Sequence, residues 1–170
     1  MMRIFWGLLF ALNAGYAFAQ SSFGLKNVYH GDPLTVAELR ARAPLLSNCQ
    51  NSAVTAICWG IVPLGSNKST MTVMLREGSV VYIDAQISTK AFGQISEALR
   101  DEYGEGQALP DSRDRVWVKD GVMMNLTEHH RKQAGISLLA IGRPGVLIEM
   151  AAARGRANQG QSSRPSDILR

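Results

Sequence analysis

One stretch of the chain constrains the fold more than any other. It covers residues 116–126, where two short segments rich in β-branched, aromatic and other apolar residues (VWVK and VMMNL) flank Asp120-Gly121. A two-residue Asp-Gly loop suits a type I′ turn, because both of its central residues take a positive φ. The pattern therefore predicts a β-hairpin over residues 116–126.

A second hairpin is predicted earlier in the chain. Apolar and mostly polar residues alternate over residues 70–76, residues 80–85 form the returning strand, and Glu77-Gly78 lies between them. Alternation with a period of two is typical of a strand with one buried face. The two hairpins indicate a protein built largely on antiparallel strand pairs.

Each hairpin follows a predicted helix. Thr35 and Glu38 match the S/T-x-x-E capping box, and Pro44 ends the short helix that begins there. A second helix is predicted over residues 90–103, where apolar residues recur at spacings of three and four, and Gly104 is placed to close it.

The order of these elements predicts the fold class. Residues 35–85 and 88–141 each hold a helix followed by strands, with no residue-level repeat between them, and residues 136–141 and 146–150 supply further strands. Short turns between neighbouring strands imply an antiparallel sheet. We expect an α+β protein, a two-layer sandwich with two helices on one face of the sheet, in the order helix–strands–helix–strands.

The N-terminus has the features of an export signal. Arg3 precedes an apolar run over residues 4–12, and Ala17-Phe18-Ala19 has the small-x-small pattern of a cleavage site. We interpret residues 1–19 as a cleavable signal peptide, with a buried N-terminal helix as the alternative, and residues 20–150 as a single α+β domain. No cysteine occupies the cleavage position, and no later segment is long and apolar enough to span a bilayer. The mature protein is therefore expected in the periplasm or outside the cell.

Export changes the interpretation of the two cysteines. Cys49 and Cys58 are nine positions apart, and in an oxidising compartment such a pair is expected to form a disulfide. Their spacing differs from the CxxC of redox-active pairs. We predict a structural disulfide, and the alternative is two free thiols.

The net charge of +4 resides at the two ends of the chain. Of the 18 basic and 14 acidic residues, Arg3 is in the signal peptide, and residues 151–170 hold four arginines and one aspartate. Residues 20–150 then hold 13 residues of each sign, so we expect no basic face for nucleic acid. Residues 151–170 lack apolar periodicity and are predicted to be a disordered basic tail, able to contact anionic lipid or cell-wall polymer only weakly.

Few residues suggest chemistry. Glu128, His129 and His130 have the donor types of a zinc or copper site, but neighbours on a strand point apart, and His30, the third histidine, is distant in sequence. We expect no cofactor and no bound metal. If the protein did bind a metal, His129 and His130 would be the candidate ligands. Neither a GxSxG motif nor a glycine-rich phosphate loop occurs, and the prediction is a protein without enzymatic activity.

Methionines on the predicted strands suggest a binding surface. Met74 is opposite in phase to Met71, and Met124 to Met123, so both faces of the sheet carry apolar side chains. A partly apolar second face either packs against another layer or docks a partner. Met74, Met124 and Trp117 are therefore the candidate partner-binding residues, with core packing as the alternative.

Several short motifs carry a resemblance to known proteins. They are Phe23-Gly24, the capped helix before the cysteine pair, Tyr103-Gly104 at the end of the second helix, and the hairpin with Trp117 and Asp120-Gly121. With these motifs the mature chain resembles a diffuse group of small exported bacterial α+β proteins. In architecture it is similar to the β-lactamase inhibitor protein and to the small lipoprotein of the outer-membrane assembly machine. The lipidation cysteine of that lipoprotein is absent here, and no contact residue of either protein is carried over.

The resemblance implies binding to another protein across a sheet face or its loops. We accordingly expect a periplasmic, non-enzymatic protein-binding module of the inhibitor, immunity or envelope-accessory type. The alternative is a periplasmic carrier of a small ligand or a metal.

Overall fold

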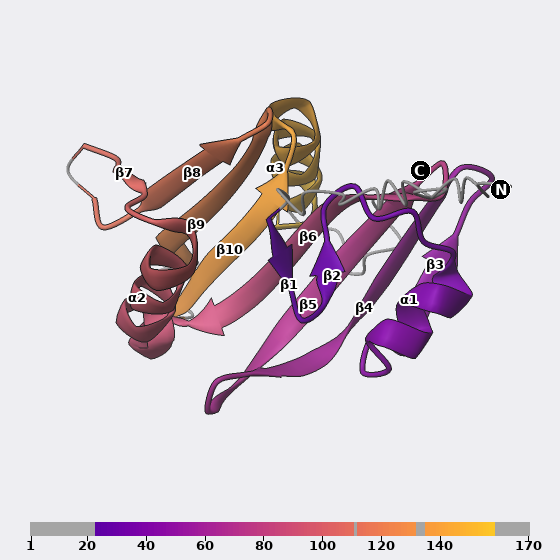
Figure 1. Cartoon of the computed structure of the whole chain (residues 1–170), viewed down its shortest axis with the longest axis horizontal. Coiled ribbons are helices and arrows are strands. Elements are labelled where there is room, and N and C mark those ends of the chain that lie inside the picture. Colours follow the sequence, from indigo (N-terminus) through magenta and orange to yellow (C-terminus); the bar gives the residue numbers. More distant parts are fainter. Residues whose placement is uncertain (1–22, 111, 132–134, 159–170) are drawn as a thin grey trace, which may run out of the picture.

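The computed structural model describes residues 23–110, 112–131 and 135–158. Its centre is an eight-stranded antiparallel sheet with the strand order β3-β4-β5-β6-β10-β9-β8-β7 (Figure 1). These strands are β3 (Asn48–Asn51), β4 (Thr55–Leu64), β5 (Asn67–Arg76), β6 (Ser79–Ser88), β7 (Gln107–Ala108), β8 (Arg115–Lys119), β9 (Val122–Arg131) and β10 (Ile136–Gly142). A separate hairpin joins β1 (Gly24–Leu25) to β2 (Val28–Tyr29).

The strand order divides the sheet into two halves. β6 and β10, the last strands of the two predicted helix-plus-strand units, pair antiparallel at its centre, with Ile136 opposite Ser88 and Gly142 opposite Tyr82. From this pair one half continues outward through β5, β4 and β3, and the other through β9, β8 and β7. The expected antiparallel α+β class is confirmed, and the two units share one continuous sheet.

Tight turns fix the register within each half. Glu77 and Gly78 between β5 and β6 have φ values of 52° and 73°, and Asp120 and Gly121 between β8 and β9 have values of 51° and 74°. Positive φ at both central residues is the geometry of a type I′ turn. Both predicted hairpins are confirmed.

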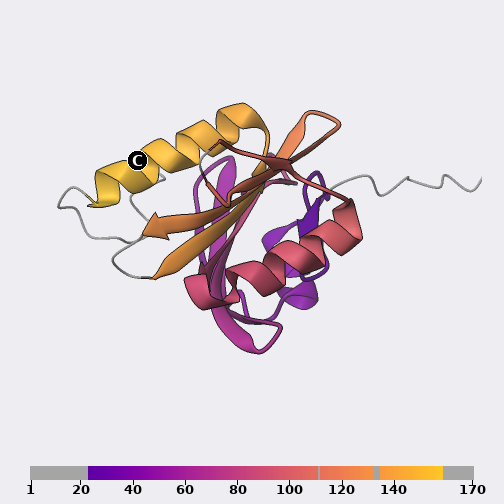
Figure 2. The same cartoon turned by 90° about the vertical axis from the view of Figure 1, so that its left-hand side faces the viewer.

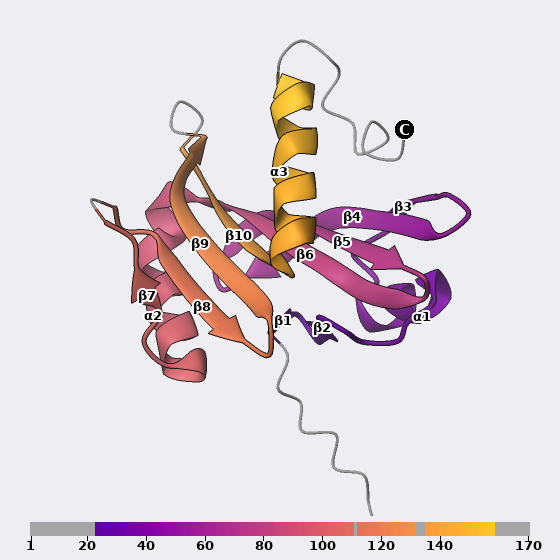
Figure 3. The ribbon, with the colours of Figure 1, turned by 90° about the horizontal axis from the view of Figure 1, so that it is seen from above.

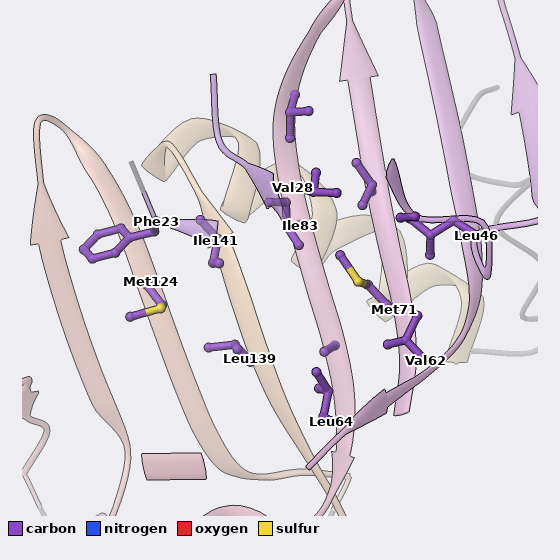
Figure 4. Close-up of a cluster of buried hydrophobic side chains, with 14 of the residues drawn as sticks. Phe23, Val28, Leu46, Val62, Leu64, Met71, Ile83, Met124, Leu139 and Ile141 are labelled. Carbon is purple, nitrogen blue, oxygen red and sulfur yellow. The ribbon is translucent and has the colours of Figure 1, made fainter. Parts of the chain in front are cut away.

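Two helices cover one face of the sheet. α1 (Val36–Arg42) begins at the predicted capping box, where the Glu38 backbone N–H donates to Thr35 Oγ1 at 3.2 Å and the Thr35 N–H donates to Glu38 Oε2 at 2.8 Å. α2 (Phe92–Tyr103) follows the 3₁₀ turn η1 (Thr89–Ala91) and ends at Gly104. Between these helices and the sheet lies the main core (Figure 4), which includes Phe23, Leu39, Leu46, Val62, Met71, Ile83, Phe92, Leu99, Met124 and Leu139.

The predicted disulfide is present and lies at one end of the sheet. Cys49 on β3 is directly opposite Cys58 on β4, and the two Cα atoms are 4.1 Å apart. Such a short separation is characteristic of a non-hydrogen-bonded antiparallel pair. Because Cys58 is fully buried, the disulfide ties the short edge strand β3 to the main core.

The structure of residues 144–158 differs from the predicted layout. The sequence predicts an edge strand over residues 146–150 and a disordered tail over 151–170, whereas the structure has a helix, α3 (Pro144–Asn158). α3 lies on the face of the sheet opposite α1 and α2 (Figures 2 and 3). The molecule therefore has three layers instead of two, and the tail prediction is wrong for residues 151–158.

The remainder of the predicted tail, residues 159–170, and the predicted signal peptide, residues 1–19, lie outside the described residues. Within the described ranges, no helix combines the length and the apolarity needed to cross a membrane.

The sequence does not reveal α3 because apolar residues of this helix face both the sheet and the solvent. Val146, Leu147 and Met150 pack toward the sheet, while Ile148 and the neighbouring Ala151 and Ala152 are exposed, so no 3.6-residue periodicity marks one face. Proline at the first helical position and a run of alanines favour a helix independently of periodicity. Beneath α3 lies a second, smaller core, formed on the sheet by Ile57, Met74, Tyr82, Leu138 and Ala140.

Candidate functional site

The three predicted partner-binding residues are all buried. Met74 is covered from the side of α3, and Met124 and Trp117 belong to the main core. The Trp117 indole Nε1–H donates to the Gly104 backbone carbonyl at 2.8 Å, which satisfies its only polar group. The burial of Met74, Met124 and Trp117 favours the alternative of core packing for each, and their contact with a partner stays a prediction.

The histidine pair lies on β9. His130 is half-buried there, while the side chain of His129 lies outside what the structure describes. Over the described ranges, no group of three or more histidine, cysteine, aspartate or glutamate side chains is arranged to hold a metal ion.

A polar cluster lies between α3 and the sheet. Asp84 on β6 is 2% exposed, and Arg154 of α3 forms an ion pair with it while donating hydrogen bonds to Asp84 Oδ2 and to Tyr82 Oη. The Arg154 guanidinium also lies 5.6 Å from the centre of the Tyr82 ring. Burial raises the pKa of Asp84 and of Tyr82, and the nearby cation of Arg154 lowers both, which only partly offsets the effect of burial.

The chemistry of this cluster is that of a structural anchor. Both charges are largely removed from water, and each is the partner of the other. A second, exposed ion pair between Arg76 of β5 and Glu149 of α3, at 2.8 Å, lies on the same helix. Sequence reasoning missed the anchor because it assigned Arg154 to a disordered tail.

Exposed apolar side chains lie at several separate places on the side of the sheet that carries α3. Ile61 on β4 lies on the same face as Ile57, because side chains alternate along a strand. Val118 on β8 is in register with Met123, which is opposite Gly142 on β10. Ile148 is on the outer side of α3. We call Trp59, Ile61, Val118, Met123 and Ile148 together the α3-side surface.

The exposed fractions single out this surface. Ile148 is 70% exposed, Val118 65% and Ile61 63%, the three highest values among the large apolar side chains that the structure describes. Sequence reasoning missed all three residues. The alternation of side chains along the strands could have placed Ile61 and Val118 on the second face of the sheet. It could not show that, within the described ranges, α3 covers only the middle of that face.

Hollows in the described surface lie on the other side or at the edge of the molecule. One of about 270 Å³ lies between the start of α1 and the turn from β3 to β4. A smaller one of about 80 Å³ lies above Trp117 and has charged walls. A third, of about 210 Å³, lies where α1 ends beside β4.

No protein-family model, no curated protein and no solved structure matches this chain.

Proposed function

We propose that this chain is an exported, non-enzymatic protein-binding module that binds its partner through the α3-side surface. The observation that carries the proposal is the position of the three most exposed large apolar side chains, Ile61, Val118 and Ile148, which all lie on one side of the sheet. A partner that covers this side of the sheet, α3 included, would remove all three side chains from water, which favours binding.

Export is supported by the disulfide and by the sequence of residues 1–19. Structural disulfides such as that between Cys49 and Cys58 form and persist mainly in oxidising compartments. The measurement that tests export is the intact mass of the protein recovered from the periplasm. We expect a chain that begins at Gln20 and has no free thiol.

A carrier of a small ligand is the second candidate, and it has less support. Three hollows of the described part of the chain, of about 270, 210 and 80 Å³, are each smaller than the roughly 300 to 1,000 Å³ of most small-molecule sites. A surface that excludes water against another protein needs no such cavity.

Affinity capture from envelope extract tests the proposal. The wild-type protein and the variants Val118→Asp and Ile148→Asp serve as baits, and Val54→Asp is the matched control, since Val54 is 60% exposed but lies beside α1. We expect one partner that the wild type and Val54→Asp retain and that both α3-side variants lose. Equal capture by all four baits, or capture by none, would exclude this surface as the binding site.

A further inference from the structure

The hollow of about 210 Å³ combines an apolar interior with a cationic margin. Its apolar lining comes from the end of α1 and from β4, namely Ala43, Pro44, Leu45, Val62 and Pro63. Lys26, Asn27 and Arg42 supply the polar part of the lining. Ala43 and Val62 are buried and form the base, whereas Leu45 is 52% exposed and stands at the margin.

The walls of this hollow are held firmly in place. Pro44 restricts the backbone after α1, and the next residues run close to β4, where a methyl group at Gly60 would lie 1.8 Å from the Leu45 carbonyl oxygen. Leu46 is fully buried in the main core beside Val62 (Figure 4). A hollow with fixed walls loses little conformational entropy when it is filled.

The charges around the hollow favour an anion. Lys26 and Asn27 are the two central residues of the turn between β1 and β2, with φ values of 52° and 64°, so their side chains are presented at a tight turn. Arg42 pairs with Asp32 at 2.9 Å, and the hollow has no acidic lining residue. Among the described residues, no carboxylate is paired with Lys26, so it is the cation at this margin that can bind an anion.

We propose that this hollow binds the C-terminal residue of another polypeptide. The large apolar side chain of that residue fills the space between Leu45 and Val62. Its free carboxylate lies at the margin, where Lys26 supplies a charge-assisted hydrogen bond and Asn27 a neutral one. The hollow lies on the face of the sheet that carries α1, opposite the α3-side surface, and β4 contributes to both, so it is a second point of contact that is tested through other residues.

The adjoining edge of the sheet indicates that the occupant is a polypeptide. β3 pairs with β4 only as far as Trp59, which is opposite Asn48, so within the described chain no strand pairs with Ile61 or Pro63 on that edge. Because Cys58 is a non-hydrogen-bonded partner of Cys49, alternation directs the Ile61 N–H and C=O to the same free edge. An extended segment can bond there while its last residue enters the hollow.

Peptide binding to the purified, disulfide-bonded protein tests this site. The probe is an acetylated pentapeptide, Ser-Val-Thr-Val-Phe, with a free C-terminal carboxylate, and binding is followed by amide chemical-shift changes. We expect the changes to centre on Lys26, Leu45 and Val62, and amidation of the C-terminus to weaken binding about tenfold. Changes centred elsewhere, equal binding of the amide, or no binding at millimolar peptide would overturn the proposal.

Paired variants assign the binding to this hollow. Leu45→Asp places a negative charge at the margin and should weaken binding about tenfold, whereas Val54→Asp, at another exposed apolar position, should leave it unchanged. Lys26→Gln should weaken it severalfold, and Lys119→Gln, at an exposed lysine of another hairpin, should not. Sodium octanoate is the final comparison, and binding of octanoate as tight as that of the pentapeptide would assign the hollow to a free fatty acid and contradict the proposal.

Discussion

The ion pair between Asp84 and Arg154 determines how α3 is attached to the sheet. The two side chains contact each other between β6 and α3, largely removed from water. Such an ion pair adds little net stability, because removing both charges from water costs about as much free energy as their attraction supplies. Removing one partner leaves an uncompensated charge in the interior. The pair therefore fixes where α3 lies on the sheet.

Arg154→Met should lower the free energy of unfolding by about 3–5 kcal/mol at pH 7, because it leaves the Asp84 carboxylate unpaired. Burial already raises the pKa of Asp84, and the variant also removes the cation that opposes this shift. The folded state then binds a proton more readily than the unfolded chain. Stability is consequently greatest below the unfolded pKa of about 3.9 and falls as the pH rises through the folded pKa. Urea unfolding between pH 4 and 7 measures this dependence.

The double variant Asp84→Asn, Arg154→Met is the control for that titration. It has no buried carboxylate, so its loss of stability should not grow with pH as that of Arg154→Met does. A loss in Arg154→Met that is the same at pH 4 and pH 7 would contradict a charged Asp84 beneath α3.

Gly60 is the residue at which β4 and the connection from α1 approach most closely. Gly60→Ala would bring its methyl group to within 1.8 Å of the Leu45 carbonyl oxygen, so the backbone must shift, and we expect a loss of about 1–3 kcal/mol. Gly155→Ala is the matched control, because its site on α3 is open and alanine favours a helix by about 1 kcal/mol. Thermal unfolding of both variants gives the comparison, and equal effects of the two substitutions would exclude the close approach.

At the scale of single residues, the sequence predicts what depends on near neighbours. The Thr35–Glu38 capping box, the positive φ of Asp120 and Gly121 and the pairing of Cys49 with Cys58 need only short-range information. The burial of Met74 could not be predicted in this way. Its phase places it on the second face of the sheet, but only the position of α3 decides whether that face is covered.

Among the elements, β3 depends most on a covalent link. It is a four-residue edge strand, and its pairing with β4 includes the disulfide between Cys49 and Cys58. Reduction should lower the free energy of unfolding by about 2.5–3 kcal/mol, the chain-entropy estimate for a loop of about ten residues. Urea unfolding of the protein with and without dithiothreitol measures this loss, since no side chain is changed. A difference below about 1 kcal/mol would show that the disulfide does not constrain the unfolded chain as that estimate requires.

The helices and strands differ in how well their sequence patterns predict them. β5, β6, β8, β9 and α2 have the alternation or the helical spacing that their one-sided burial demands, and all were predictable. α3 packs on the sheet through Met150 and Ala153 yet exposes Ile148, so its sequence has no polar side to mark it as a surface helix. Its first residue, Pro144, and its alanines are the remaining signals.

For the whole molecule, the two faces of the sheet differ in how completely they are covered. α1, α2 and the β1–β2 hairpin cover the main core, whereas α3 covers only the middle of the opposite face (Figures 1 and 3). Among the described residues, no element covers the two flanks of that face, where Ile61 and Val118 lie on either side of the helix that carries Ile148. The expectation of an apolar second face was sound, but of the methionines chosen from the sequence Met74 is buried beneath α3 and Met124 lies in the main core.

Photo-crosslinking in living cells measures directly whether the α3-side surface contacts a partner. A photoreactive side chain replaces Ile148, Val118 or, as the control, Val54 in the exported protein. We expect the substitutions at Ile148 and Val118 to yield crosslinks to one and the same protein, and the substitution at Val54 to yield none to it. Crosslinks of equal yield from all three positions, or none from Ile148 and Val118, would contradict binding through this surface.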